Sequence, residues 1–492
     1  MTVQELLDGL TSTAVPPVPM AGLSCHSKEL QPGDVFVAVR GARYDGHAFV
    51  GEAARRGACA VVVEHPPQER VACPVVVVDD TARLLPVMAA RWCGLPAERL
   101  HVLGVTGTCG KTTTTYLIRA MLEADGRRTG LVGTVAYEIG VRHLPSVNTT
   151  PGPLMLQRLL AQMVHQGLDW CAMEISSHAL DQNRVAGMHL DAAVWTCLGS
   201  DHLDYHKTLA HYAAAKRKIF SYLRSDGRAV INADDEEGRR LIDTLVPATV
   251  RRDQVVTFGV ERPAMVSARL VRSDWSGMDL VMDTAWGTFP LRSQLVGRYN
   301  ISNIAAATAA MLAVGVRVPA IQDALAGFPT VPGRLERVPN DSGIHVVVDF
   351  AHTADALRLV LLSLRELVRG RLIVVFGCGG DRDRTKRPVM GQLASLLADQ
   401  VVLTSDNPRS EDPMAIIQDV KSGFVQGFSR FSVMPDRRQA ILQALSMASA
   451  DDAVLIAGKG HEAYQIFQHV TVPFSDRAVV EEYFTHTAHA VA

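Results

Sequence analysis

The feature that most constrains the fold of this chain is a glycine-rich segment that follows a short apolar run and precedes a helix-forming run. The apolar run is His101–Val105, and the segment after it reads Gly107-Thr-Cys-Gly-Lys-Thr-Thr. A loop of this kind turns backbone N–H groups toward phosphate oxygens at a helix N-terminus. Its lysine reaches the β- and γ-phosphates of a nucleotide, and its threonine hydroxyl can coordinate Mg²⁺.

We therefore predict a strand, a phosphate loop and a helix that bind ATP or GTP. Val105 stands where the general pattern G-x-x-x-x-G-K-T has its first glycine, so the loop is a variant of that pattern. A glycine-rich turn without a ligand is the alternative, and the Gly-Lys-Thr sequence argues against it. The predicted nucleotide-binding residues are Gly107, Thr108, Gly110, Lys111, Thr112 and Thr113.

The rest of the chain alternates short β-branched runs with helical segments, which is typical of mostly parallel α/β sheets. Its 492 residues correspond to about three domains of ~150 residues each. Clusters of Gly and Pro that break regular structure lie at 93–96 and 328–334. We predict an α/β protein of three domains: a small N-terminal α/β domain at 1–98, a central P-loop ATPase domain with a mostly parallel sheet at 99–332, and a C-terminal Rossmann-like domain at 333–492.

Individual elements follow from the same runs. The Ala-rich stretch 304–316 predicts a buried helix, because it is too short to span a membrane. The runs that predict strands are 35–39, 60–63, 75–78, 101–105, 192–195, 229–232, 345–349, 372–376, 401–404 and 453–456.

Charge and composition exclude several classes of partner. Lys plus Arg number 49 and Asp plus Glu number 51, so no bulk positive field attracts nucleic acid or an anionic membrane surface. No apolar run reaches the ~18 residues of a membrane span, and residues 1–8 lack the pattern of a secretory signal. The eight cysteines are scattered without a Cys-x-x-Cys pair, which is typical of reduced thiols. We expect a soluble, cytoplasmic monomer that binds small molecules, and neither nucleic acid nor membrane.

Further motifs follow the phosphate loop along nearly the whole chain. They are Asn148-Thr-Thr-Pro, Met173-Glu-Ile-Ser-Ser-His-Ala-Leu-Asp-Gln-Asn-Arg, Asp201-His-Leu-Asp-Tyr-His, the Ala-Ala-Lys that ends at Lys216, Gly297-Arg-Tyr-Asn, Gly333-Arg-Leu-Glu, Asp349-Phe-Ala-His-Thr and Asp406-Asn-Pro-Arg. With the variant loop, these motifs resemble the Mur ligases, the ATP-dependent enzymes that add amino acids to the peptidoglycan precursor. They look most like the member that adds meso-diaminopimelate to the D-glutamate of UDP-N-acetylmuramoyl-L-alanyl-D-glutamate. The resemblance implies that ATP phosphorylates the acceptor carboxylate and that the amine then attacks the acyl phosphate.

The resemblance also implies metal ligands and catalytic residues. Thr112, Glu174 and His202 correspond to Mg²⁺ ligands, although a histidine alone would more often be a surface or core residue. Lys216 corresponds to the lysine that the family carbamylates with CO₂, which turns a cation into a carboxylate able to hold a second Mg²⁺. The alternative is that Lys216 is an ordinary solvated lysine of a helix. Lys218, two residues later, is the lysine most easily confused with it. The implied catalytic residues are Lys111, Glu174, His202, Lys216 and His352.

Three further residues correspond to contacts with the rest of the nucleotide. Asn300, Arg334 and Asp349 resemble the family's adenine, phosphate and ribose contacts. Arg334 falls in the interdomain hinge, so it could report domain closure to the γ-phosphate. The alternative for Asn300 is an ordinary polar residue at a helix N-terminus. His352 would orient either a phosphate or the incoming amine.

The nucleotide-sugar dipeptide would lie between the first two domains. Its diphosphate and carboxylates would meet hydroxyl groups and a guanidinium, which suit those anions. In the first domain Ser27 matches a family serine, but the motif reads His26-Ser27-Lys28 here, and the next uridine-side segment reads Ala42-Arg43-Tyr44. Both differ from the family's common sequences. The predicted contacts are Ser27, Thr149, Thr150, Ser176, Gln182 and Arg184.

A recognition loop for the amino acid follows the predicted strand 401–404. The loop reads Asp406-Asn407-Pro408-Arg409, and its plain alternative is a turn started by Asn-Pro. Meso-diaminopimelate carries a distal amine and carboxylate, whereas lysine ends in an ammonium alone. A guanidinium at Arg409 would pair with the carboxylate and repel a lysine terminus. The resemblance adds Arg382, Gly458 and Glu462 to this pocket, with Glu462 accepting from the distal ammonium.

Two other functions remain as alternatives. The His-Ser-Lys departure favours a paralogous amide ligase that uses lysine or a secondary-metabolite substrate. A scaffold that binds ATP without ligation is the other alternative. The presence of Lys111, Thr112, Glu174, His202 and Lys216 argues against such a scaffold.

Overall fold

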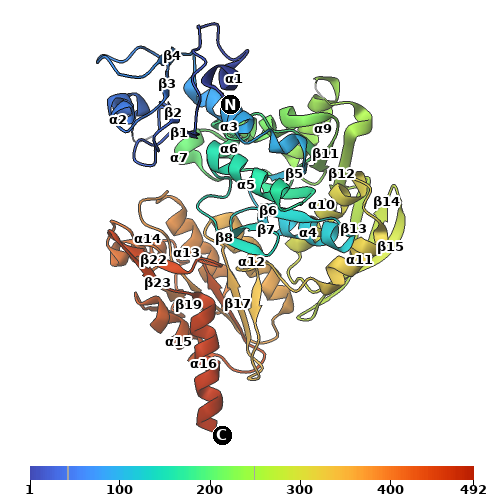
Figure 1. The fold of residues 1–492 in the computed structure, drawn as a ribbon. Helices are drawn as coiled ribbons and strands as arrows, with labels where there is room; N and C mark the ends of the chain where they lie inside the picture. Colours follow the sequence, from blue (N-terminus) through green and yellow to red (C-terminus); the bar gives the residue numbers. More distant parts are fainter. Residues whose placement is uncertain (42–43, 249, 492) are drawn as a thin grey trace.

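The structure is a computed structural model that describes residues 1–41, 44–248 and 250–491. The chain forms three sheets in succession, each with helices packed on it, and a two-stranded ribbon (Figure 1). We call the parts built on these sheets the N-terminal, central and C-terminal domains. The predicted α/β class with mostly parallel sheets is confirmed, and each sheet lies within one predicted domain range.

The N-terminal domain is a parallel four-stranded sheet in the order β1-β2-β3-β4. Its strands are short and almost entirely buried, because helices cover them. The elements are α1 (Val3–Leu7), β1 (Gly22–Ser24), β2 (Asp34–Val37), η1 (Gly46–Phe49), α2 (Val50–Arg55), β3 (Ala60–Val63), β4 (Val75–Val77), α3 (Thr81–Trp92) and η2 (Pro96–Glu98).

The central domain contains an eleven-stranded sheet in the order β15-β14-β13-β12-β11-β10-β5-β9-β6-β7-β8. The strands from β13 to β6 in that order are parallel neighbours, and antiparallel hairpins extend both edges. The elements are β5 (His101–Thr106), α4 (Lys111–Ala124), β6 (Thr129–Val132), β7 (Ala136–Ile139), β8 (Arg142–Pro145), α5 (Pro153–His165), β9 (Trp170–Glu174), α6 (Ser177–Asp181), β10 (Leu190–Trp195), α7 (Leu203–His206), α8 (Leu209–Arg217), η3 (Lys218–Tyr222), β11 (Leu223–Asn232), α9 (Glu236–Ala248), η4 (Arg252–Gln254), β12 (Val255–Gly259), β13 (Val266–Asp274), β14 (Gly277–Thr284), β15 (Gly287–Ser293), α10 (Tyr299–Ala313) and α11 (Val318–Gly327).

Both faces of this central sheet are packed. Leu103 and Val105 of β5 belong to the core formed with α4, α10 and α11, whereas Val102 belongs to the opposite core formed with α5 and α6. Alternate residues of a strand point to opposite faces, so a run buried on both faces is apolar throughout. The Ala-rich helix is α10, which starts before the predicted stretch and ends at Ala313, two residues before Gly315.

The C-terminal domain has a six-stranded sheet in the order β16-β17-β21-β18-β19-β20, in which only the β16–β17 pair is antiparallel. Ligands bind at the carboxyl ends of the strands in open sheets of this kind. The elements are β16 (Glu336–Val338), β17 (His345–Asp349), α12 (Ala354–Leu367), β18 (Leu372–Phe376), α13 (Lys386–Leu397), β19 (Gln400–Leu403), α14 (Pro413–Lys421), β20 (Phe431–Val433), α15 (Arg437–Met447), β21 (Ala453–Ala457), β22 (Tyr464–Phe467), β23 (Val470–Pro473) and α16 (Asp476–Val491).

The cysteines and the lengths of the helices are the subject of two further predictions. All eight cysteines are free thiols, as their scattered positions predicted. Among the helices of the described residues, none has both the length and the apolar character that a bilayer crossing requires.

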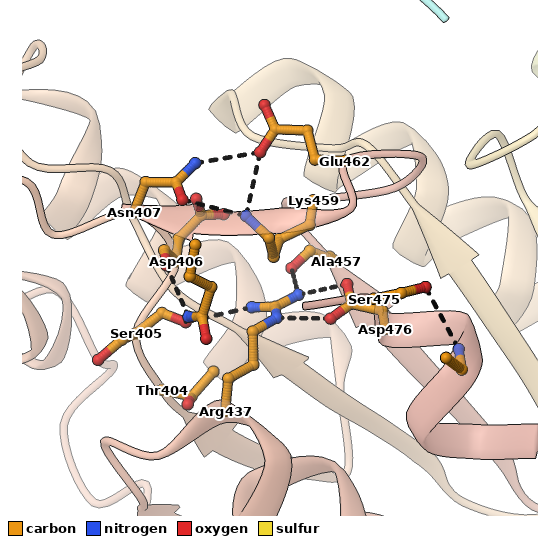
Figure 2. A network of polar contacts seen from close by, with 12 residues as sticks. Thr404, Ser405, Asp406, Asn407, Arg437, Ala457, Lys459, Glu462, Ser475 and Asp476 are labelled. Carbon is orange, nitrogen blue, oxygen red and sulfur yellow. Dashed lines mark hydrogen bonds and ion pairs between the residues drawn. The ribbon is translucent and has the colours of Figure 1, made fainter. Parts of the chain in front are cut away.

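A buried ion pair joins the last two long helices to the C-terminal sheet. Arg437 begins α15 and donates to both carboxylate oxygens of Asp476 at 2.7 Å, and neither side chain is exposed (Figure 2). The same guanidinium donates to the carbonyl oxygen of Ala457 at 3.0 Å. The neighbouring pair, Arg438 and Glu482, joins the same two helices at the surface.

We predict that Asp476→Asn lowers the stability of the C-terminal domain by about 3–5 kcal/mol, because it leaves the Arg437 guanidinium buried without its counter-charge. The matched control is Glu482→Gln, which removes the exposed pair and should cost at most about 1 kcal/mol. Thermal melting followed by circular dichroism measures both. Equal melting temperatures for the two variants would show that the buried pair contributes no more than the exposed one.

Candidate active site

The phosphate loop connects β5 to α4, as its sequence predicted, and two of its glycines have positive φ. Gly107 (φ 148°) lies against the side chain of Thr196, and Gly110 (φ 85°) lies against Asn303, so neither position has space for a Cβ atom. Lys111 folds back and donates from Nζ to the carbonyl oxygens of Gly107 at 2.9 Å and Thr108 at 3.0 Å. The loop therefore has the backbone geometry of a phosphate cradle and a cation beside it.

Glu174, the last residue of β9, is fully buried beside the start of α4. Its Oε2 accepts from the hydroxyl groups of Thr112 and Thr134, both at 3.0 Å, and its Oε1 accepts from the Thr134 backbone N–H at 2.7 Å. These bonds stabilise a buried carboxylate next to the phosphate loop. Thr112 and Glu174, two of the predicted metal ligands, are thus in direct contact.

Lys216 is also fully buried, although it is a lysine in a helix. Its Nζ donates to the carbonyl oxygen of Gly107 at 2.7 Å and stands 4.5 Å from the ring centre of Tyr212. Burial, reinforced by the positive charge of Lys111, lowers the pKa of Lys216 well below its usual value. Lys218 is exposed instead and pairs with Asp181 at 3.1 Å. The two lysines therefore differ sharply in environment.

His202, like Lys216, lies near the ring of Tyr212. Its ring stands 6.3 Å from that of Tyr212, and it has a left-handed backbone conformation (φ 55°). Burial, assisted by Lys111 and Lys216 against the opposing effect of Asp201, lowers the pKa of His202. The imidazole is therefore neutral at neutral pH, which is the form that binds a metal ion.

By position, the four predicted ligands fall into two pairs: Thr112 and Glu174 are hydrogen-bonded to each other, whereas His202 and Lys216 both lie near the ring of Tyr212. Within the described part of the chain, no group of three or more His, Cys, Asp or Glu side chains could by itself hold a metal ion. The first pair fits Mg²⁺ in the chemistry of its donors, because Glu174 and Thr112 supply oxygen ligands. Lys216 fits only as a carbamate, and burial favours the neutral amine that such a modification requires.

The hinge into the C-terminal domain reaches the phosphate loop directly. Arg334 donates to the Thr112 hydroxyl at 3.1 Å, and its guanidinium lies 4.6 Å from the ring centre of Phe350. Asp349 is buried at the end of β17 and accepts from the backbone N–H groups of Leu335 at 2.6 Å and Ala351 at 2.8 Å. The predicted phosphate and ribose contacts are thus neighbours at the junction of two domains.

The hinge also lies against the amino-acid side of the C-terminal domain. Gly333 (φ 67°) packs directly on the backbone of Gly460 and His461, with no space for a Cβ atom. The carbonyl oxygen of Gly333 accepts from the backbone N–H of Phe350 at 2.9 Å. One tight junction therefore holds the hinge, the end of β17 and the segment after β21.

His352 follows this junction. Its Nδ1 is 2.8 Å from the carbonyl oxygen of Phe350, so Nδ1 carries the proton and donates it. Burial and the nearby Lys386 lower the pKa of His352. A neutral His352 therefore keeps an unshared electron pair on Nε2.

Asn300 is buried in the first turn of α10. It donates to the carbonyl oxygen of Val296 at 2.8 Å and accepts from Asn303 at 2.8 Å. Asn303 in turn touches Gly110 of the phosphate loop. Asn300 thus belongs to a polar chain that leads to the loop.

The predicted contacts for the nucleotide sugar in the central domain form one network around Thr150. The Thr150 hydroxyl donates to the carbonyl oxygen of Glu174 at 2.9 Å and accepts from the backbone N–H of Ser176 at 3.0 Å. Arg184 donates to the carbonyl oxygen of Thr150 at 2.9 Å and to Gln182 at 2.7 Å. The hydroxyls of Thr149 and Thr134 are 3.0 Å apart, which links this network to Glu174.

Ser27 belongs to a separate group in the N-terminal domain. Its hydroxyl donates to Glu52 at 3.1 Å, and Arg56 pairs with the same carboxylate and also donates to the carbonyl oxygen of Lys28. Ser27 therefore belongs to a local polar group around the Glu52–Arg56 ion pair, to which Lys28 contributes its backbone carbonyl oxygen. Ala42 and Arg43 lie outside the described residues, and Tyr44 is exposed.

The predicted amino-acid pocket lies at the carboxyl ends of β18, β19 and β21. Arg382 and Arg409 both approach Gly379, where Arg409 would meet an added Cβ atom. Arg409 donates to the carbonyl oxygen of Gly380 at 2.7 Å, while Arg382 is exposed. Burial and the repulsion of Arg382 lower the pKa of Arg409. The structure therefore places the Arg409 guanidinium and the side chain of Arg382 on the same glycine, at one end of the pocket.

The other end of the pocket is acidic and amide-lined. Asn407 donates to Glu462 at 3.0 Å (Figure 2). Gly458 (φ 116°) leaves space for the buried Asp406, which a Cβ atom would obstruct. Pro408 is buried next to Asn407. The segments 406–409 and 458–462 thus form two walls that contact each other.

Several residues in these networks were not predicted from the sequence. Thr134, Tyr212, Asn303 and Lys459 contact predicted site residues directly. Lys459 lies between the predicted residues Gly458 and Glu462, and Thr134 closely follows the end of β6, so both positions offered a signal in the sequence. Tyr212 and Asn303 lie in the same helices as Lys216 and Asn300 but outside the quoted motifs, so no such signal marked them in the sequence.

Comparison with known proteins gives matches along the chain. It matches models of the Mur ligase family catalytic domain at residues 19–103, the Mur ligase middle domain at 105–311 and the Mur ligase glutamate ligase domain at 333–460. A UDP-N-acetylmuramoyl-L-alanyl-D-glutamate–2,6-diaminopimelate ligase of Gloeobacter violaceus is 46% identical over 486 residues, which is 98% of each chain. The ligase of the same name from Geobacillus thermodenitrificans is 44% identical over 467 residues, 94% of each chain.

Solved structures agree with this. A structure of a ligase with that name is 33% identical, with a TM-score of 0.71 over 99% of both chains. The MurF ligase of Thermotoga maritima in complex with ADP has the same fold at 21% identity, with a TM-score of 0.65 over 97% of this chain and 100% of that one. The domain matches and the full-length relatives lead to one conclusion: this chain belongs to the Mur ligase family.

Proposed function

We propose that this chain is the ATP-dependent ligase that adds meso-diaminopimelate to the D-glutamate of UDP-N-acetylmuramoyl-L-alanyl-D-glutamate in peptidoglycan precursor synthesis. The observation that carries the proposal is the charge pattern of the C-terminal pocket. The positive charge of Arg382 acts on the Arg409 guanidinium beside Gly379, and a carboxylate bound there would offset this repulsion. Glu462 supplies the opposite charge for an ammonium. The names of the full-length relatives support the same substrate.

The reaction joins a carboxylate and an amine through an acyl phosphate. The acceptor carboxylate attacks the γ-phosphorus of ATP and ADP leaves; the amine then attacks the acyl carbon and phosphate leaves. Lys111 and Arg334 would neutralise the phosphate oxygens as charge moves between them. Asn300 and Asp349 would hold the adenine and ribose, with Gly107, Thr108, Gly110 and Thr113 lining the phosphates.

His352 suits the amine rather than a phosphate. Its Nδ1 proton is committed to the Phe350 carbonyl oxygen, so its Nε2 can accept a hydrogen bond or a proton but cannot donate to an anion. We infer that His352 orients the incoming amine and accepts the proton that it loses.

Metal ions would be held by the two pairs of ligands. Thr112 and Glu174 would bind one Mg²⁺, and His202 with a carbamate on Lys216 would bind another. Bound Mg²⁺ would lower the repulsion between the acceptor carboxylate and the γ-phosphate. Burial of Lys216 supports the modification, because the neutral amine is the form that adds to CO₂.

The domains would share the substrates between them. The N-terminal domain, through Ser27, and the network of Thr149, Thr150, Ser176, Gln182 and Arg184 would bind the nucleotide-sugar dipeptide. We infer that the protein is cytoplasmic, because its UDP-linked substrate belongs to that compartment. We further infer that it is a monomer and that its partners are these small molecules.

The direct test offers meso-diaminopimelate, L-lysine and L-ornithine in competition, with ATP, Mg²⁺ and the UDP-dipeptide, and identifies products by mass. We expect a tripeptide product that contains diaminopimelate alone. A lysine product would assign the chain to a paralogous ligase. ATP binding without turnover on any amine would indicate a scaffold.

Arg409→Ala should reduce the preference for diaminopimelate over lysine. The lost charge-assisted hydrogen bonds amount to about 1.5–3 kcal/mol, or roughly 10- to 100-fold in the ratio of kcat/KM values. Steady-state kinetics with each amino acid measures this ratio. An Arg409→Ala enzyme with the full wild-type preference would contradict the assignment of Arg409 to the distal carboxylate.

Lys216→Ala should lower kcat by roughly 100-fold or more, because it removes the group that would hold a metal ion at the reacting phosphate. Short-chain carboxylates such as acetate should restore part of the activity by replacing the carbamate. Lys218→Ala is the matched control, since Lys218 is exposed, and it should retain wild-type activity. Equal losses in the two variants, without rescue by carboxylates, would refute the carbamate.

A further inference from the structure

Lys459 is a lysine with no exposed surface, and its side chain joins the two walls of the amino-acid pocket (Figure 2). Its Nζ is 3.1 Å from Oδ1 of Asn407, which follows β19, and 3.0 Å from Oε2 of Glu462, which follows β21. It also lies 5.5 Å from the ring centre of Tyr464. One ammonium group therefore connects two segments that are adjacent in space and distant in sequence.

Two donors hold one oxygen of Glu462, because Asn407 Nδ2 and Lys459 Nζ both donate to Oε2 (Figure 2). The Tyr464 hydroxyl also interacts with this carboxylate. The Glu462 side chain is 21% exposed, whereas that of Lys459 is 0% exposed. Glu462 can thus reach a ligand in the pocket, and Lys459 can act only through its neighbours.

The backbone that carries Lys459 is held in place as well. Arg437 donates to the carbonyl oxygen of Ala457, two residues before Lys459, and the buried Asp476 holds that arginine. The Asn407 side chain is fixed by a third contact, because its Oδ1 also accepts from the backbone N–H of Ile466 at 3.0 Å. The backbone before Lys459 and the Asn407 side chain that its ammonium contacts are therefore both held in place.

A glutamate without such contacts would sample several rotamers, and ordering it would cost part of the binding free energy. A misplacement of about 1 Å at a binding group can cost about 100-fold in rate. Lys459 removes both costs before the substrate arrives, and its charge balances that of Glu462 when no substrate is bound.

We propose that Lys459 is a positioning residue that sets Glu462 to receive the distal ammonium of the incoming diamino acid. The inference rests on the proposed function for the presence of a diamino acid, and on the described contacts for the role of Lys459. It concerns the preference of the enzyme for a substrate with a distal amine over the same substrate without one. It applies to whichever diamino acid the enzyme uses.

The test is Lys459→Met, which keeps the length of the side chain and removes the ammonium. It compares kcat/KM for the diamino acid that the wild-type enzyme ligates with that for its analogue without the distal amine: 2-aminopimelate for diaminopimelate, or norleucine for lysine. A site built to bind an amine rejects the analogue strongly. We expect this discrimination to fall about 10- to 100-fold, through a higher KM for the diamino acid, with the KM values for ATP and the UDP-dipeptide unchanged.

Lys421→Met is the matched control, because Lys421 also stands over an aromatic ring, Phe431 at 5.1 Å, but lies outside the pocket. In this control variant, the ratio of kcat/KM for the diamino acid to kcat/KM for its analogue should equal that of the wild type. Lys459→Gln is the second variant, since its amide keeps a donor in the buried site if methionine prevents folding. A lower melting temperature with unchanged discrimination in either folded Lys459 variant would make Lys459 merely structural and overturn the proposal.

A double-mutant cycle with Glu462→Gln tests the route of the effect. If Lys459 acts through Glu462, the Lys459 substitution should change discrimination by less than about 2-fold in the Glu462→Gln background. Independent, multiplicative effects would overturn the proposal. A wild-type enzyme that ligates lysine would refute the diaminopimelate assignment alone, and the cycle with lysine and norleucine would still decide the role of Lys459.

Discussion

The removal of charged groups from water is the constraint on which the site depends. Lys216, Glu174, Lys459 and Arg437 are all fully buried, and each would destabilise the fold without compensation. The compensation differs in kind. Arg437 has a full counter-charge, Glu174 has three hydrogen bonds from threonines, and Lys459 has an amide and a carboxylate. Lys216 has only a carbonyl oxygen and an aromatic ring, and it is the group with the strongly lowered pKa.

The parallel sheets explain why these groups gather where they do. The phosphate loop follows β5, Glu174 ends β9, and Thr134 closely follows β6, so all three lie at the carboxyl edge of the central sheet. The pocket segments follow β18, β19 and β21 in the same way. Hydrophobic strands thus fix the polar residues that come directly after them, and the loops need little structure of their own.

Much of the fold could be predicted from the sequence because strands buried on both faces are continuous β-branched runs. His345–Asp349 and Leu372–Phe376 are strands with the predicted bounds. The hairpins β13 to β15 at the sheet edge were not predicted, because they mix polar and apolar residues and pair antiparallel. In the site, the motifs indicated Glu174, Arg334 and Arg409. Burial, which separates Lys216 from Lys218 and marks Lys459, is a tertiary property that a single sequence does not contain.

The contact between Gly333 and Gly460 has a mechanical consequence. The two backbones touch without intervening side chains, so the hinge that carries Arg334 and the segment that carries Lys459 and Glu462 cannot move independently. A movement of this unit relative to the phosphate loop would therefore displace Arg334 and the segment of Lys459 and Glu462 together. If the nucleotide and the amino acid bind as proposed, the pair of glycines ties the position of one binding site to that of the other.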